Sequence, residues 1–99
     1  MAYQIEFQDS ARYEADAILN YLKSKDEQSA DNFYKDLQKC CVQLREGIVD
    51  YALSRFVTLA KQGYHSVFFN NYVVLYFQEG DKRTIAHIFH QSQDYASLV

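Results

Sequence analysis

Three histidines are the side chains of this sequence best suited to acid–base chemistry near neutral pH. Cleavage of RNA through its 2′-hydroxyl, for example, needs a base, an acid for the leaving oxygen and cations beside the phosphate. In a regular strand, His87 would share a face with Ile85 and Phe89, whereas His90 would lie on the opposite face. His87 and His90 should therefore not line one site together. An ordinary half-buried strand position is the alternative for each of them and for His65.

The groups that would assist these histidines are sparse. The candidate cations are Lys61, Lys82 and Arg83, and the last two lie beside a predicted hairpin turn, where charged pairs are usually solvated. No carboxylate or thiolate falls at a ligand spacing from the histidines, so we predict no metal site and no cofactor. Adjacent Cys40 and Cys41 would point about 100° apart on a helix, which disfavours a disulfide and favours small core or boundary positions.

Length and charge limit the classes of function. The chain has 99 residues, enough for one domain spanning 1–99. Its formal net charge of −3 disfavours strong direct binding of nucleic acid. No apolar run approaches the ~20 residues of a membrane span, and a secretion signal is not apparent, so we expect a cytoplasmic protein with no membrane partner.

The N-terminal quarter predicts a strand and then a helix. Residues 3–7 alternate between apolar and polar types, as in a half-buried strand. Asp9 and Ser10 offer an N-cap for the helix that follows. Glu14 and Asp16 lie off its apolar stripe and are expected to face solvent. The stripe consists of Ala11, Ala15, Ile18, Leu19 and Leu22.

A second amphipathic helix follows after almost no loop. Ser24 and Glu27 have the spacing of a capping box, and Gly47 is a natural terminator. Such closely spaced helices favour an antiparallel hairpin. Phe33 and Leu37 are expected to seal it against a sheet. The complete stripe is Ala30, Phe33, Leu37, Cys40, Cys41 and Leu44.

The C-terminal third predicts an antiparallel meander. Residues 63–69, 72–77 and 84–90 are β-rich runs joined by short polar connections. The continuously apolar run 72–77 is typical of a central strand covered on both faces. Residues 48–60 are ambiguous, with 56–59 either a short strand or an extended approach. The predicted fold is α+β: an N-terminal strand, a two-helix antiparallel hairpin and a three-stranded antiparallel meander, with the helices packed on one sheet face.

Three motifs in this order resemble the ParE/RelE family of bacterial toxins. They are Gly-Tyr-His at 63–65, Asn-Tyr-Val-Val-Leu-Tyr at 71–76 and the closing Asp94-Tyr95. The resemblance covers nearly the whole chain and implies the same α+β layout. It also implies the toxin of a type II toxin–antitoxin, plasmid-stabilisation pair. A cognate antitoxin would then lay a helix or strand over the apolar surface of the toxin.

Departures from the family pattern bear on the target. Relatives usually carry Arg where this chain has His65, and often Arg where it has the run 91–93 (Gln-Ser-Gln). The ribonuclease branch of the family uses basic residues to cut messenger RNA on the ribosome. The ParE branch inhibits DNA gyrase and requires no nucleolytic residues. The resemblance therefore favours gyrase as the target.

Two alternatives stay open within the resemblance. In a ribosome-dependent mRNA endonuclease, His65, His90 and Tyr95 would be the catalytic candidates; Tyr95 could instead be a tail aromatic that pins the terminus to the sheet. A degenerate member would bind its antitoxin without being toxic. The residues implied for substrate or target contact are Lys61, Arg83, Gln93 and Asp94.

Overall fold

The computed structural model contains a four-stranded sheet and four helices, and it describes residues 2–47, 53–54 and 56–99. No helix in this part of the chain is both long and apolar enough to cross a bilayer. In chain order the elements are β1 (Gln4–Phe7), α1 (Asp9–Lys25), α2 (Glu27–Glu46), α3 (Val57–Lys61), β2 (His65–Phe69), β3 (Tyr72–Glu79), β4 (Lys82–His90) and α4 (Tyr95–Leu98).

The strands lie in the order β1-β4-β3-β2. β2, β3 and β4 form the antiparallel meander, and β1 pairs in parallel with β4, with Gln4 opposite Lys82 and Phe7 opposite Ile85. Two parallel strands need a long crossover connection between them, and the α1–α2 hairpin is the first part of the connection from β1 to β4. The predicted α+β order of strand, helical hairpin and meander is confirmed. The parallel pairing of the first strand is an additional finding.

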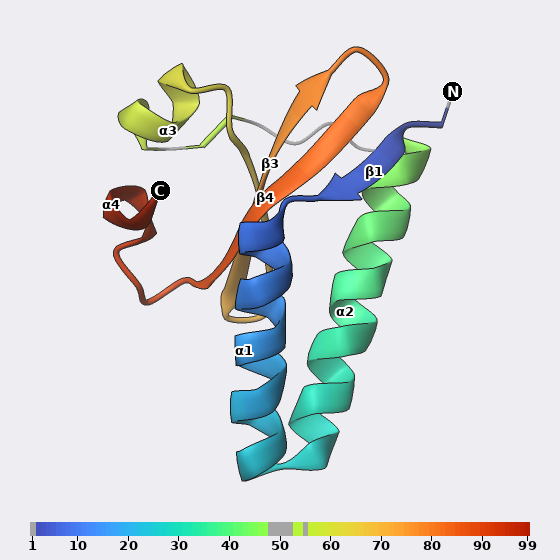
Figure 1. Cartoon of the computed structure of the whole chain (residues 1–99), viewed down its shortest axis with the longest axis vertical. Coiled ribbons are helices and arrows are strands. Elements are labelled where there is room, and N and C mark those ends of the chain that lie inside the picture. Colours follow the sequence, from blue (N-terminus) through green and yellow to red (C-terminus); the bar gives the residue numbers. More distant parts are fainter. Residues whose placement is uncertain (1, 48–52, 55) are drawn as a thin grey trace.

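Each face of the sheet has its own core. α1 and α2 cover one face, where Phe33 and Leu44 pack with Val74 and Ile85. α3 and α4 cover part of the other face, and Figure 1 shows them on the side of the strands away from α1 and α2. The second core comprises Leu59, Val73, Leu75, Phe89 and Tyr95. The prediction of a central strand buried on both faces is confirmed for β3, where residues 73–76 are buried.

A β-bulge changes the alternation of β4. Ile85 and His87 pair with adjacent residues of β3, which leaves Ala86 as the extra residue. Ile85 and Ile88 consequently both belong to the core beneath α1 and α2. The regular alternation expected for this strand is therefore wrong at Ile85. His87 does stay with Phe89, and their rings stack with centroids 5.2 Å apart.

Both α1 and α2 begin differently from the prediction, whereas α2 ends where predicted. α1 begins at Asp9 without a side-chain cap, and Ser10 Oγ donates instead to the Ala86 carbonyl. α1 also continues through Lys25, so Ser24 lies in its last turn and cannot begin α2; Asp26 caps α2 by accepting a backbone N–H. Gly47 ends α2 at φ 66°, as predicted from its tolerance of the left-handed region.

Residues 57–61 form a short helix, α3, rather than the strand or extended segment expected for 56–59. Its first turn is closed by a 2.9 Å hydrogen bond from the Ala60 N–H to the Phe56 carbonyl. The helix buries Leu59 in the core on the second sheet face, and this tertiary packing overrides the local β propensity. Residues 48–52 and 55, the rest of the ambiguous stretch, lie outside the described residues.

The start of α1 replaces a neighbouring strand along the outer edge of β4. β1 ends opposite Ile85, and beyond it α1 supplies the hydrogen bonds through its own side chains. The Ser10 hydroxyl donates a hydrogen bond to the Ala86 carbonyl, and Glu14 Oε1 accepts the Ile88 N–H at 3.0 Å. Glu14 Oε2 also lies 3.0 Å from His87 Nδ1. Glu14 is thus a half-buried anchor, so the expectation that it faces solvent is wrong.

We expect Glu14→Ala to lower the free energy of unfolding by about 1–3 kcal/mol, because it leaves the Ile88 N–H without its acceptor. Glu14→Gln keeps an acceptor oxygen and should lose less. Asp16→Ala is the control, since Asp16 is exposed on the same helix. Urea denaturation followed by circular dichroism measures all three. Equal losses for Glu14→Ala and Asp16→Ala would contradict the anchoring role.

Candidate functional site

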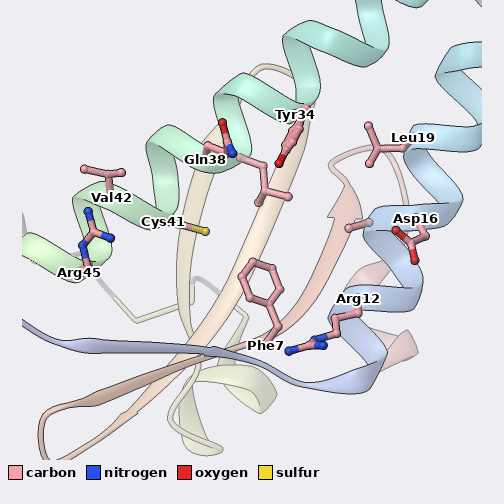
Figure 2. Close-up of a pocket in the computed structure, with 11 residues that line it drawn as sticks. Phe7, Arg12, Asp16, Leu19, Tyr34, Gln38, Cys41, Val42 and Arg45 are labelled. Carbon is pink, nitrogen blue, oxygen red and sulfur yellow. The ribbon is translucent and has the colours of Figure 1, made fainter.

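A groove of about 820 Å³ runs between α1 and α2 on the side away from the sheet strands β2 and β3 (Figure 2). The antiparallel helices diverge enough to leave part of their apolar stripes open, and Phe7 of β1 lies between them. This volume is in the range of ordinary ligand sites. The apolar lining consists of Phe7, Ala15, Leu19, Leu37, Cys41 and Val42.

Leu37 lines this groove and also packs against the core beneath α1 and α2. It is only partly buried, whereas Phe33 retains 2% of its exposure and Leu44 none. The expectation that Leu37 helps to seal the hairpin against the sheet holds in part: Leu37 packs against the core on this sheet face, but its side chain stays partly exposed and also lines the groove. Phe33 does seal the hairpin, with its ring centroid 4.8 Å from that of Tyr72. An apolar side chain left half open on a groove floor is typical of a binding surface.

Charged side chains sit on the rims of the groove. Arg12 and Asp16 come from α1, and Arg45 comes from the last turn of α2. The Tyr3 N–H donates to the Arg45 carbonyl, which fixes this end of α2 beside β1. Arg12 lies in the first turns of α1, directly after β1. Both arginines therefore lie at the β1 end of the groove.

The structure places His65 and His90 far apart. His65 pairs with Tyr76, while His90 pairs with Tyr72, four residues away along β3 and on its other side. That offset alone amounts to about 13 Å along the strand. His65 stacks on Tyr76 at 5.1 Å, and the His90 Nδ1 accepts the Ser92 N–H at 3.1 Å. The two candidate histidines do not come together in one site.

Tyr95 packs inward at the start of α4. It is 1% exposed, its ring lies edge-on to Phe56 at 5.1 Å, and it stacks over Phe89 at 6.3 Å. Its hydroxyl is buried and has no hydrogen-bond partner among the described residues. This placement agrees with a tail aromatic that pins the terminus to the sheet.

Arg83 is a buried structural cation. It is 2% exposed, its guanidinium carbon lies 3.9 Å from the centre of the Tyr3 ring, and Nη1 donates to the Leu44 carbonyl at 3.0 Å. Its Nε donates to Gln78 Oε1 at the same distance. The expectation of a solvated Lys82-Arg83 pair is therefore wrong for Arg83, which ties β4 to the end of α2. Lys82 is partly exposed and forms an ion pair with Glu6 at 3.7 Å.

The other predicted contact residues lie at the surface. Lys61 ends α3, and Gln93 and Asp94 precede α4. All three are exposed, although Gln93 Oε1 accepts the His90 N–H at 2.9 Å. Within the described residues, no group of three His, Cys, Asp or Glu side chains is placed to hold a metal ion.

Sequence reasoning did not find the groove or its two arginines. Arg12 and Arg45 are 33 positions apart in the chain, and neither belongs to a recognisable motif. The available signal was the width of the two apolar stripes, which include Leu19, Leu37 and Cys41 in addition to the residues that the sheet can cover. When the apolar face of a helix is wider than the surface that packs against it, part of that face stays open.

Comparison with known proteins identifies the family. The model of the family described as "ParE toxin of type II toxin-antitoxin system, parDE" matches residues 5–95, most of the chain. The chain belongs to the ParE toxin family. A solved structure of the chromosomal ParDE toxin–antitoxin system from P. aeruginosa is similar in fold, with a TM-score of 0.69 and 14% sequence identity. The similarity covers 90% of this chain and 96% of that one. Among curated proteins, none matches this sequence.

Membership of the ParE family confirms the resemblance inferred from the three motifs. The match begins in β1 and ends at Tyr95, so it includes both helices of the groove and the whole meander. At 14% identity the similar structure supports the fold, not the role of individual side chains. Because the ParE family supplies the toxin of the two-protein ParDE system, membership implies that an antitoxin is the natural partner of this chain.

Two adjacent thiols offer a probe of the ParE groove. Burial raises the pKa of Cys40 to about 12, and burial also raises the pKa of Cys41, with Arg45 acting in the opposite direction. Because the thiolate is the nucleophile, both thiols should react slowly at pH 8, and Cys41, on the groove floor, should react first. Its rate should keep rising as the pH passes 9.

Iodoacetamide labelling read by mass spectrometry measures this order, with Cys40→Ser and Cys41→Ser identifying each site. In the folded protein we expect labelling of the Cys40→Ser variant and almost none of the Cys41→Ser variant. Faster labelling of Cys40 than of Cys41 would contradict the placement of Cys41 on the groove floor.

Proposed function

We propose that this ParE-family chain is a toxin that binds and inhibits DNA gyrase, and that a cognate antitoxin neutralises it by occupying the groove between α1 and α2. The proposal places both proteins in the cytoplasm, where gyrase acts on DNA, and gives the pair a role in plasmid or chromosome maintenance. The toxin family and the implied antitoxin support the first part. The open apolar groove supports the second.

The choice of target rests on one observation: the residues that could catalyse RNA cleavage do not come together in one site. His65 and His90 pair with residues four positions apart on β3, and Tyr95 is buried against Phe56 and Phe89. Arg83, a cation of β4 within the meander, is engaged with Tyr3, Gln78 and the Leu44 carbonyl. A phosphoryl-transfer site needs its base, acid and cation within reach of one phosphate. This arrangement favours inhibition by binding.

The exposed residues of α3 and α4 are the candidate contact surface for gyrase. Lys61 ends α3, and Gln93 and Asp94 lead into α4. The ring contact between Phe56 and Tyr95 holds these two short helices side by side. We propose that this end of the molecule contacts the target while the groove serves the antitoxin.

A ribosome-dependent mRNA endonuclease remains the second candidate, because one observation favours it. His90 is partly exposed, and the Ser92 N–H binds its Nδ1, which leaves the proton of a neutral ring on Nε2. An imidazole held in this way could act as an acid or a base. A member that binds its antitoxin without toxicity is the third candidate.

Induced expression of the chain alone in a bacterial host tests toxicity. We expect growth to slow, and co-expression of the product of the neighbouring open reading frame to restore it. A western blot confirms that the protein accumulates, and the His90→Ala variant should slow growth equally. Normal growth at confirmed accumulation would favour the non-toxic alternative.

A further inference from the structure

A row of exposed side chains runs along α1 at every fourth position. Its members are Asp9, Tyr13, Ala17, Tyr21 and Lys25, and all five are exposed. Tyr13 is 78% exposed and Tyr21 is 62% exposed, so two large rings stand mostly in water. Lys25 Nζ lies 5.7 Å from the centre of the Tyr21 ring. Because residues four apart in a helix are neighbours on one face, the row is a single ridge, with a ring on each side of Ala17 and a charge at each end.

This row is separate from the two surfaces of α1 that the fold already uses. The side facing the core carries Ala11 and Ala15, and the groove side carries Arg12 and Leu19 (Figure 2). At about 100° per residue, Ala17 lies about 160° from Leu19 around the helix and about 140° from Arg12. In Figure 1 the C-terminal half of α1 extends beyond the sheet, with α2 along one side. A protein bound to the row would therefore leave the groove open.

The row is symmetric about its middle residue, with opposite charges at its two ends. α1 spans Asp9–Lys25, so Ala17 is the midpoint of the helix. The tyrosines lie four positions before and after Ala17, and Asp9 and Lys25 lie eight positions before and after it. The other charges of the helix follow the same pattern. Residues 9–16 hold one basic and three acidic side chains, a net charge of −2, and residues 18–25 hold two lysines, a net charge of +2.

We propose that this row binds a second copy of the chain, and that the two α1 helices pack antiparallel about a two-fold axis that passes beside Ala17. In a two-fold interface the same patch of each copy faces its counterpart. A residue n positions before Ala17 then lies opposite the residue n positions after Ala17 in the second copy. Tyr13 meets Tyr21 of the second copy, and Asp9 meets Lys25 of the second copy. The inference does not depend on the proposed inhibition of gyrase.

The row suits the commonest packing of two helices. Ridges of residues four apart are inclined to the helix axis, and two such ridges lie side by side when the axes cross at about 50°. The ridges themselves then run parallel, so the contacts at Asp9 and Lys25, each about 12 Å from Ala17, are kept. The small side chain of Ala17 lets the helices approach closely at the axis. The rings of Tyr13 and Tyr21 supply the apolar area, as tyrosines commonly do at interfaces.

The charge pattern favours an antiparallel copy over other occupants. A parallel arrangement of two copies would place like charges together, and a partner of one sign would match one half of α1 and oppose the other half. Acids near the start of a helix and lysines near its end also complement the helix dipole, but the exposed tyrosines have no such role. Two tyrosines per copy cover less than a standard interface, so we expect a weak dimer with a dissociation constant of roughly 10–100 μM.

Sedimentation velocity of the full chain at low salt, from about 1 to 300 μM, measures the association. The decisive variants are Asp9→Lys and Lys25→Asp. Each makes both end contacts repulsive, so each should weaken the dimer by at least about five-fold, although the two variants change the net charge in opposite directions. An equimolar mixture of the two should recover the dimer, because one variant carries Lys at both ends of the row and the other carries Asp at both ends.

Ala17→Glu tests the position of the two-fold axis. Two carboxylates would then face each other at the centre of the interface, and the variant should stay monomeric up to 300 μM, about three-fold above the weakest dissociation constant expected. Asn32→Glu is the matched control, since it adds the same charge at an exposed position of α2, and it should dimerise like the unmodified chain. Thermal melts at low concentration should be the same for both variants, because both positions are exposed.

Four results would overturn the proposal. They are a chain that stays monomeric at every concentration, a mixture of Asp9→Lys and Lys25→Asp that associates no better than either variant alone, an Ala17→Glu variant that still dimerises, and labelling of Cys41 that slows as the dimer forms. The last result would place the second copy in the groove, which Cys41 lines. An unchanged labelling rate at 300 μM, with a dimer present, is the result expected for contact through the row.

Discussion

Phe33→Ala should destabilise the protein by about 3–5 kcal/mol, a large part of the stability of a domain this small. Phe33 is 2% exposed and joins α2 to the meander. Its ring centroid lies 4.8 Å from that of Tyr72 and 5.9 Å from that of Phe69. Truncation removes the ring and leaves a cavity between helix and sheet, which neighbouring rings can only partly fill.

Leu37→Ala is the matched control, since Leu37 lies on the same helix but is only partly buried, at the edge of the core and in the lining of the groove. Because its side chain is already half open, its truncation should cost about 1–2 kcal/mol, less than a buried leucine. Urea denaturation followed by circular dichroism gives both values. If Leu37→Ala proved as destabilising as Phe33→Ala, the groove would have to be closed in solution.

Arg83→Met should cost about 3 kcal/mol although methionine nearly preserves the volume and the burial. The guanidinium bonds the Leu44 carbonyl at the end of α2 and Gln78 in the β3–β4 hairpin, and it lies over the Tyr3 ring. Its removal leaves a buried carbonyl unpaired and deletes a cation–π contact. Arg83→Lys should recover only part of the loss, because an ammonium lacks the planar fork.

Lys82→Ala provides the comparison with an exposed cation at the adjacent position. Its ion pair with Glu6 is 3.7 Å long and its side chain is 38% exposed, so its loss should cost less than about 1 kcal/mol. Denaturant midpoints for the three variants decide the matter. A loss for Arg83→Met no larger than that for Lys82→Ala would show that Arg83 is a solvated surface residue after all.

The order of the elements could be predicted because it is encoded in local periodicity. The stripe that begins at Ala11 and Ala15 has the helical period, and the apolar run 72–77 has the composition of a central strand. Gly47 marked the end of α2 through its tolerance of positive φ. These signals depend only on neighbouring residues, and the structure confirms them.

The features that escaped prediction all depend on distant parts of the chain. Arg83 is buried because Tyr3 and the end of α2 surround it, 80 and 39 positions away. Glu14 is an anchor because β1 ends early and leaves the Ile88 N–H open. The bulge at Ala86 likewise shows itself only in the register with β3. In each case a polar group is satisfied by tertiary contacts that no local pattern specifies.

The same limit applies to the candidate site. His65, His90 and Tyr95 were grouped by residue type and by resemblance, but the sheet register separates the two histidines and α4 turns Tyr95 inward. The groove that the structure presents instead is formed by helix surfaces whose residues are unremarkable one by one.

Supercoiling of relaxed plasmid by purified DNA gyrase is the measurement that tests the central claim most directly. The purified chain should inhibit supercoiling in proportion to its concentration, and His90→Ala should inhibit equally. The product of the neighbouring open reading frame should relieve the inhibition, while ribosome-bound message incubated with the chain stays intact. Unimpaired supercoiling, together with cleavage of message at the ribosomal A site that His90→Ala or Tyr95→Phe abolishes, would contradict the account.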